Sequence, residues 1–355
     1  MPPDGRWGEE LGVIGETVVH RLDPARAGTV SSRRRCLCAI AVGLVAGAFS
    51  MTLSFSDFDQ LWMAAHAVRA GRDPYAALHG SIWHDLYYPL PAVLLTIPWT
   101  LLPRNVAHAC VAGLGLGTAT YALSSRGWWA LVGLISYPAL DAALLAQWSP
   151  FLIAAALLPY LEWIAVAKPT TGIATVASYA MARPLRRISL SVAVSASLVC
   201  TCFVVQPDWL PRWLAAIRSA RHFAPIVVRP GGALLLAALL RWRLPEARLV
   251  VLLALLPQTI APYEALLLTL ALASRREALV FSFASFAMHP FLSSGDPAVS
   301  FVMRIDHDAP IIILFLYLPV LIMILRRPNA GRVPSWIEQI AGSLPPWLRG
   351  TDLAS

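Results

Sequence analysis

Long apolar runs repeat along almost the whole chain, and short polar turns separate them. The first run covers about 36–55, and the others follow between residues 89 and 325. The runs are continuous and do not alternate between apolar and polar residues, which favours membrane-spanning helices over a membrane β-barrel. Several runs are short or broken by proline. Measured against a need of about 20 residues for a straight span, they predict an all-α polytopic bundle of about 10–12 transmembrane helices.

Arginines recur in the turns between these runs. They lie at 33–35, 183–187, 241–248, 275–276 and 326–327. Because positive residues concentrate in cytoplasmic loops, their spacing indicates which turns share one side of the membrane. We expect 1–35 to be a cytoplasmic segment, 36–327 the transmembrane domain and 328–355 a cytoplasmic tail. The same alternation places the loops 56–88 and 292–309 outside a plasma membrane.

Composition supports a membrane protein and disfavours both a nucleic-acid-binding protein and a protein held together by disulfides or metal. The chain is 57% hydrophobic and only 14% charged. Its net charge of +8 comes from arginines in the turns, so we interpret it as a topology signal and expect no nucleic-acid partner. The five cysteines lie in apolar runs, where cysteine packs as a small hydrophobe, so we expect neither a disulfide framework nor a metal site.

The first outer loop, 56–88, combines charge with helical periodicity. Residues 58–69 place apolar side chains at helical spacing, which predicts an amphipathic helix that could lie on the membrane surface. Asp57 and Asp59 stand at its start. Ser56 as N-cap with Asp59 at the third position approximates a capping box, so the carboxylates have a structural explanation as well as a functional one. On a regular helix the two point about 200° apart, so they are not expected to act together.

Several motifs in a fixed order resemble the membrane glycosyltransferases of family 87, actinobacterial enzymes that use polyprenyl-phosphate-mannose. The motifs are Ser-Asp-Phe at 56–58, Ala-Ala at 64–65, Gly-Arg-Asp-Pro-Tyr at 71–75, Tyr-Pro-Leu-Pro at 88–91, and Gln147 followed by Lys168-Pro169. In the last region Ala146 stands where the family has glycine. The resemblance implies a GT-C-type fold whose first outer loop carries the catalytic base.

The resemblance also assigns roles to individual residues. By position Asp57 matches the family's acidic residue, with Asp59 as the fallback. The expected substrate-binding residues are Asp59, Tyr75, Gln147 and Lys168. Glu264 is added because it stands at an outer helix end, where it could bind a sugar hydroxyl or be solvated. The implied reaction is transfer of a hexose from a polyprenyl-phosphate donor to an envelope glycolipid or glycan, with mannose as the expected sugar. The protein is expected to be surrounded by membrane lipids.

This chemistry is compatible with the residues present. An acceptor hydroxyl needs a general base, which a carboxylate can supply, and a departing phosphate needs a cation. Lys168 is the one lysine in the chain, although a lysine near a membrane interface commonly snorkels to the headgroups. A lipid phosphate is its own leaving group, so we expect no cofactor, no metal and no nucleotide pocket.

Two other functions stay open. The family usually shows a Ser-Trp-x-His motif in its second half, whereas this chain has 257–264 without histidine there. That departure leaves room for a catalytically degenerate scaffold. Asp141 lies inside an apolar run, where a carboxylate is costly and therefore a functional candidate, as in a transporter or flippase. The outer triplet 306–308, Asp-His-Asp, reads more readily as a solvated loop than as a metal site.

Overall fold

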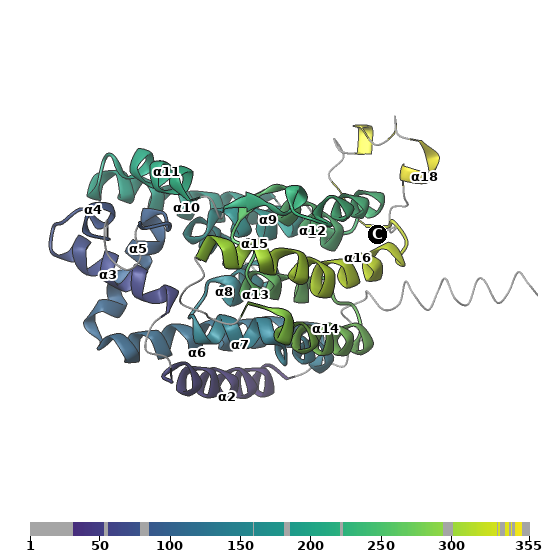
Figure 1. Cartoon of the computed structure of the whole chain (residues 1–355), viewed down its shortest axis with the longest axis horizontal. Helices are drawn as coiled ribbons and strands as arrows, with labels where there is room; N and C mark the ends of the chain where they lie inside the picture. Colours follow the sequence, from purple (N-terminus) through teal and green to yellow (C-terminus); the bar gives the residue numbers. More distant parts are fainter. Residues whose placement is uncertain are drawn as a thin grey trace, which may run out of the picture.

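The computed structural model describes residues 31–52, 56–78, 85–158, 160–180, 185–220, 223–293, 301–331, 333, 338–340, 342 and 345–349. Most of the expected cytoplasmic segment 1–35 and much of the tail 328–355 lie outside the described residues. Long helices lie side by side, with α3, α4 and α11 at one end of the molecule (Figure 1). The described strands are β1 (Ala224–Pro225) and β2 (Pro257–Gln258), which form one antiparallel pair. The all-α expectation is confirmed.

The first half of the chain contributes helices of very different lengths, from single turns to the long helices α2 and α6. They are α2 (Ser32–Ser50), α3 (Asp57–Arg69), α4 (Pro74–Leu78), α5 (Leu90–Thr96), η2 (Ile97–Leu101), α6 (Arg104–Leu123), η3 (Ser124–Arg126), η4 (Trp128–Leu134), α7 (Tyr137–Leu144), α8 (Ser149–Leu157), η5 (Glu162–Ala167) and α9 (Pro169–Ala180). The second half has α10 (Leu185–Val205), α11 (Trp209–Ser219), η6 (Ile226–Val228), η7 (Gly232–Arg241), α12 (Pro245–Leu255), α13 (Pro262–Ala265), η8 (Leu266–Ala271), α14 (Arg275–Met288), η9 (His289–Phe291), α15 (Phe301–Ile312), the π-helix η10 (Ile313–Tyr317), α16 (Leu318–Leu325) and α18 (Pro346–Arg349).

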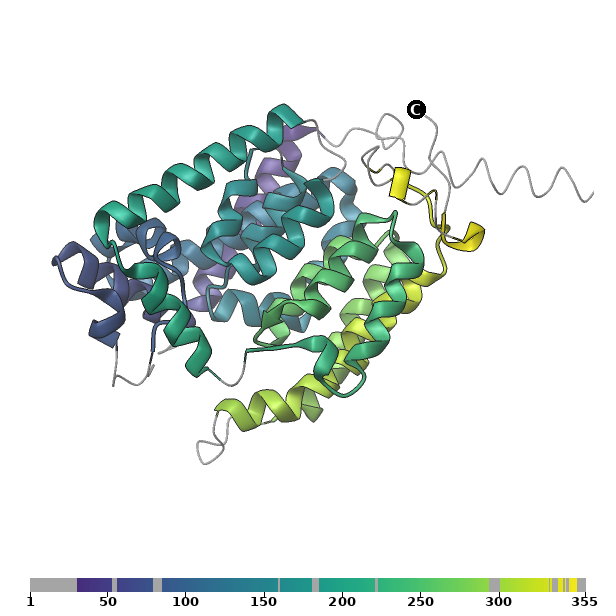
Figure 2. The same ribbon diagram turned by 90° about the horizontal axis from the view of Figure 1, so that it is seen from above.

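Three helical stretches among the described residues are long and apolar enough to cross a membrane. They are Arg104–Arg126, Ile188–Val205 and Val302–Leu325. The second belongs to α10, which runs along the outer edge of the molecule (Figure 2). A fourth span is possible if α7 and α8, bent by 113°, cross as one unit. The structure thus supports a helical protein with a few candidate spans, and the count of 10–12 stays a prediction.

Prolines explain why some expected spans are not straight helices. The apolar runs 127–146 and 149–166 do not each form one straight helix, because the chain there forms η4, α7, α8 and η5 with breaks between them. Pro138 and Pro150 each stand in the first turn of a new helix. Proline fits that position because its missing N–H would be unpaired there in any case.

The arginine-bearing turns meet at one end of the helix bundle. Arg126 donates to the carbonyls of Leu270 and Leu272, at 2.8 and 2.7 Å. Arg327 donates to Ala271 at 2.8 Å, and Arg241 reaches the end of α16. Cations placed on the last carbonyls of helices satisfy unpaired acceptors and complement the helix dipole. Turns far apart in sequence therefore share one end of the molecule.

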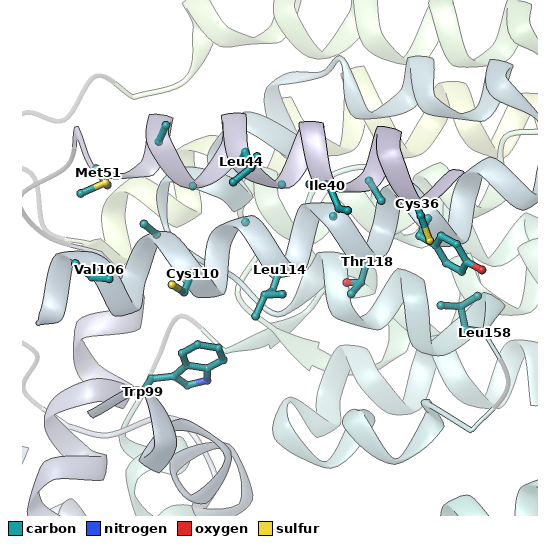
Figure 3. A pocket seen from close by; sticks show the side chains of 18 residues that line it. Cys36, Ile40, Leu44, Met51, Trp99, Val106, Cys110, Leu114, Thr118 and Leu158 are labelled. Carbon is teal, nitrogen blue, oxygen red and sulfur yellow. The ribbon is translucent and has the colours of Figure 1, made fainter. Parts of the chain in front are cut away.

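Helices α2 and α6 pack with their backbones almost in contact. A Cβ on Gly43 would lie 2.8 Å from the Gly113 carbonyl oxygen, and one on Gly113 would lie 2.6 Å from that of Gly43. Only glycine permits this approach, which maximises van der Waals contact between membrane helices. Beside this contact runs an apolar groove of about 750 Å³ (Figure 3). Its lining includes Ile40, Leu114 and Trp99.

The described part of the segment 56–88 is folded against the rest of the protein. Its helix α3 begins and ends where the sequence pattern indicated, but most of its apolar residues are covered by protein, with Met63 exposed. Phe58 and Leu61 are each 2% exposed, packed in two clusters with residues of α6 and α5. Helix α11 crosses the loop on the outside, where Trp213 Nε1 donates to the Tyr87 carbonyl at 3.0 Å.

The loop expected at 292–309 is helical over its second part. Helix α15 already covers the triplet 306–308, so the expectation of an irregular loop is wrong there. Asp308 accepts hydrogen bonds from the backbone N–H and hydroxyl of Ser293 at 2.8 and 2.9 Å, and Asp306 pairs with Arg229. Among the described residues no group of three or more His, Cys, Asp or Glu side chains is placed to hold a metal. All five cysteines are free.

Candidate functional site

Four side chains from distant parts of the sequence meet in the interior. Asp57 is the first residue of α3, Gln147 lies between α7 and α8, Lys168 lies between η5 and α9, and Glu264 is on α13. We call these four the polar cluster. Gln147 Nε2 donates to Asp57 Oδ2 at 2.5 Å, and Lys168 Nζ donates to Gln147 Oε1 at 3.2 Å. Lys168 Nζ also lies 2.5 Å from Glu264 Oε1.

Two tyrosines form walls around the polar cluster. The Tyr88 hydroxyl donates to Gln147 Oε1 at 3.4 Å. The Tyr263 hydroxyl makes a side-chain hydrogen bond to Asp57, and its ring centroid lies 4.8 Å from Lys168 Nζ. A lysine over an aromatic face gains a cation–π attraction that strengthens as water is excluded. Neither tyrosine was among the residues expected at the site, although Tyr88 belongs to the Tyr-Pro-Leu-Pro motif and Tyr263 adjoins Glu264.

The two aspartates of α3 diverge, as their spacing predicted. Asp59 Oδ2 accepts from the Ser56 backbone N–H at 2.8 Å, so it caps the helix. Asp59 Oδ1 also lies 2.7 Å from Arg104 Nε on α6. These two contacts occupy the carboxylate away from the polar cluster. The structure therefore gives Asp59 a positioning role and does not bring it to the site as a substrate-binding residue.

Tyr75 also stands beside the polar cluster without joining it. Its hydroxyl donates to the Tyr88 carbonyl oxygen at 3.3 Å, and its side chain is 8% exposed within an apolar cluster. Its contact supports the backbone of Tyr88, so the expectation that it binds substrate directly has no support in the geometry.

A left-handed residue presents Gln147 to the site. Ala146, 5% exposed, has a φ of 47°, a conformation that favours glycine. The Gln147 backbone N–H donates back to the Ala142 carbonyl at 2.9 Å, which ends α7. This turn directs the Gln147 side chain toward Asp57.

Asp141 holds the segment that carries Glu264. Asp141 Oδ2 accepts from the Tyr263 backbone N–H at 3.1 Å, at the unpaired N-terminus of the short helix α13. The segment 257–264 thereby delivers both Tyr263 and Glu264 to the polar cluster. Asp141 has a clear structural role next to the site.

Burial sets the electrostatics of the polar cluster. Gln147 and Glu264 are 2% and 1% exposed, the Lys168 side chain is 13% exposed, and Asp57 is partly buried. Loss of water raises the pKa of the Asp57 carboxyl above its ordinary value, against the opposing effect of the Lys168 ammonium. Burial raises the pKa of Glu264 in the same way. A partly buried carboxylate with a raised pKa is suited to accept a proton.

Comparisons with protein-family models, with curated proteins and with solved structures found no match for this chain.

Proposed function

We propose that the protein is a membrane glycosyltransferase that moves a hexose from a polyprenyl-phosphate donor to an envelope glycolipid or glycan. The proposed hexose is mannose. The observation that carries the proposal is the polar cluster itself. It joins a partly buried carboxylate to a lysine through one amide, next to helices long enough to cross a membrane. The reaction needs a base and a cation in that arrangement, and it needs no metal or cofactor.

Asp57 acts as the general base in this proposal. Its carboxylate removes the proton from the acceptor hydroxyl while that oxygen attacks C1 of the sugar. The bond from C1 to the phosphate oxygen breaks, and the phosphate leaves with the electron pair. One displacement inverts C1, so a β-linked donor gives an α-linked product. Lys168 lies where it can stabilise the negative charge of the phosphate.

The proposed setting is the plasma membrane, with the polar cluster on the extracytoplasmic side. The arginine-bearing turns meet at one end of the bundle, and the positive-inside rule assigns that end to the cytoplasm. We further propose that shorter apolar helices, such as Leu90–Leu101 and Gly232–Arg241, complete a multi-pass GT-C-like bundle.

A transporter or flippase is the second candidate, and Asp141 is the observation that favours it. This carboxylate lies in the bent pair α7–α8 and touches the backbone of Tyr263, beside the polar cluster. A row of buried ionisable groups within candidate spans is typical of proton-coupled transport. A catalytically degenerate scaffold is the third.

Transfer of labelled mannose from polyprenyl-phosphate-mannose by the purified protein in nanodiscs tests these alternatives. We expect the wild type to transfer sugar to an envelope lipid extract. Asp57→Asn should lower the rate by about 10²–10⁴, the usual cost of losing a general base. Asp59→Asn is the matched control, because asparagine still accepts from Ser56 and caps the helix. Near wild-type transfer by Asp57→Asn would refute the base assignment, and no transfer by the wild type would favour the transporter or scaffold.

A further inference from the structure

The lysine of the polar cluster is already neutralised. Lys168 Nζ is paired with Glu264 Oε1 at 2.5 Å, and Glu264 is 1% exposed. With both carboxylates ionised, Asp57, Glu264 and Lys168 sum to one negative charge. A phosphodiester would add a second negative charge in a region of low dielectric, where like charges repel strongly. The cation that a phosphate needs is therefore not available while Glu264 holds it.

Glu264 is enclosed from several directions by groups that decide its charge. Its described neighbours are Lys168 and Thr171 at the start of α9, Asp57 on α3, Tyr88 before α5, Tyr263 on its own helix, and Tyr317 on η10, with Asp141 of α7 behind Tyr263. Among these neighbours Lys168 is the cation. When it moves away, the buried Glu264 carboxylate loses the charge that compensates it, and an isolated buried carboxylate takes up a proton instead.

We propose that an anionic donor binds by exchange: its phosphate takes Lys168 from Glu264, and Glu264 accepts one proton from solvent. This inference rests on the proposed function and adds a role for Glu264. The charge balances, because the polar cluster carries one negative charge before binding and, counting the phosphate, one after it. Thr171 Oγ1 and Glu264 Oε2 are both buried without a hydrogen-bond partner among the described residues, and Thr171 lies close enough to Glu264 to influence its charge.

Lys168 is more accessible than its partner Glu264. The Lys168 side chain is 13% exposed and that of Glu264 is 2% exposed, so a phosphate would approach the lysine from its solvent side while Glu264 stays in the interior. The lysine stem is flexible and needs only a short movement of its ammonium. Burial raises the pKa of Glu264 even with Lys168 in place, and loss of the lysine charge would raise it further.

Titration calorimetry on the full chain in nanodiscs tests the exchange. The probe is a short-chain prenyl-phosphomannose, and the neutral prenol of equal length is its control. Measuring the binding heat in two buffers of different ionisation enthalpy gives the number of protons taken up. We expect about one proton per phosphate probe, none for the prenol, and an affinity that weakens by about tenfold per pH unit in the linked range. This measurement needs no variant.

Glu264→Gln sharpens the test. Without the competing carboxylate, proton uptake should vanish and the dissociation constant of the phosphate probe at alkaline pH should fall by at least about tenfold, since one repulsive charge is gone. Lys168→Met should remove the preference for the phosphate probe over the prenol. No proton uptake by the wild type, or weaker phosphate binding by Glu264→Gln with an unchanged pH slope, would overturn the exchange.

The two proposals fail in different ways. If the phosphate probe binds with proton uptake but no sugar is transferred, the exchange holds and the glycosyltransferase function fails. If sugar is transferred but binding takes up no proton, the function holds and the exchange is wrong. If the phosphate probe binds no better than the prenol to the wild type, the exchange is likewise wrong.

Discussion

The polar cluster and the groove beside α2 and α6 differ in the interactions that hold them together. At the groove, glycine backbones touch, and apolar side chains line a groove with a volume of about 750 Å³. In the polar cluster, one amide contacts a carboxylate, an ammonium and a phenol. Packing at the groove is a matter of shape, whereas the polar cluster is a matter of charge. Substitutions in the two regions should therefore affect different measurements.

The largest expected effect after loss of Asp57 is that of Lys168→Met. Removing one preorganised donor from a developing negative charge costs about 10²–10³ in rate. Sugar transfer under donor saturation measures this loss. Leu114→Ala, which shortens a half-exposed side chain of the groove, is the comparison and should change the rate by less than about threefold. Equal losses in the two variants would contradict the division between the regions.

Gly113→Leu should do the reverse and reduce stability more than chemistry. A Cβ at this position would lie 2.6 Å from the Gly43 carbonyl oxygen, so α2 and α6 must separate. Overpacking of this kind costs about 1–3 kcal/mol or more. Thermal unfolding in detergent measures the loss, and transfer per folded molecule should be preserved. Leu44→Ala, at a 70% exposed position that lines the same groove, is the control and should unfold near the wild-type temperature.

The end of the molecule that carries α3 and the arginine-rich end are predicted to lie on opposite sides of the membrane. In a variant without its five native cysteines, a cysteine at Arg72 should react with a membrane-impermeant maleimide added outside intact cells. Arg72 is exposed on the turn after α3. A cysteine at Arg276, exposed at the arginine-rich end, should react only after the membrane is opened. The opposite pattern would place the polar cluster on the cytoplasmic side.

The pH dependence of transfer should reveal the buried carboxyls. Burial raises the pKa of Asp57, and a base must be ionised, so the rate should fall with acid at a pH above the usual Asp value of about 3.9. Acid has the opposite effect on the free energy of unfolding, which the protonated Asp57 carboxyl should increase. A raised pKa means that the folded state favours the protonated acid, so this contribution is present at low pH and is lost as pH rises through the raised pKa. Asp57→Asn should therefore unfold at a higher temperature than the wild type at pH 8 and at a similar one at pH 4. A constant difference would contradict this origin.

Local signals in the sequence were sufficient for the start of α3. Ser56 and Asp59 specify a helix N-terminus within four residues, and the divergence of Asp57 from Asp59 follows from helix geometry alone. The gathering of Asp57, Gln147, Lys168 and Glu264 was expected only through the motif resemblance. Periodicity cannot show that four separate turns meet.

The rest depended on contacts across the fold. Nothing near Tyr263 in the sequence indicates that Asp141, more than a hundred residues earlier, binds its backbone N–H. Hydropathy also could not separate straight spans from the bent pair α7–α8, since Pro138 starts a helix without lowering the apolar content of the run. The helix over the charged triplet 306–308 was missed because its charges mask the apolar face that packs against the core.

The smallest expected effect belongs to Ala146, the residue that joins the two kinds of packing. It is packed among apolar side chains, yet its left-handed backbone directs Gln147 into the polar cluster. A left-handed conformation costs a non-glycine residue about 1–2 kcal/mol, and glycine gives back about 0.5–1 kcal/mol through its freer unfolded chain. Ala146→Gly should therefore raise the free energy of unfolding by up to about 1 kcal/mol and leave transfer within about twofold. Ala143→Gly, inside α7, is the matched control and should lower stability by about 1 kcal/mol, as glycine does in a helix. If Ala146→Gly were as destabilising as Ala143→Gly, the turn before Gln147 would not be left-handed in solution, and the link between Gln147 and Asp57 would lose its structural basis.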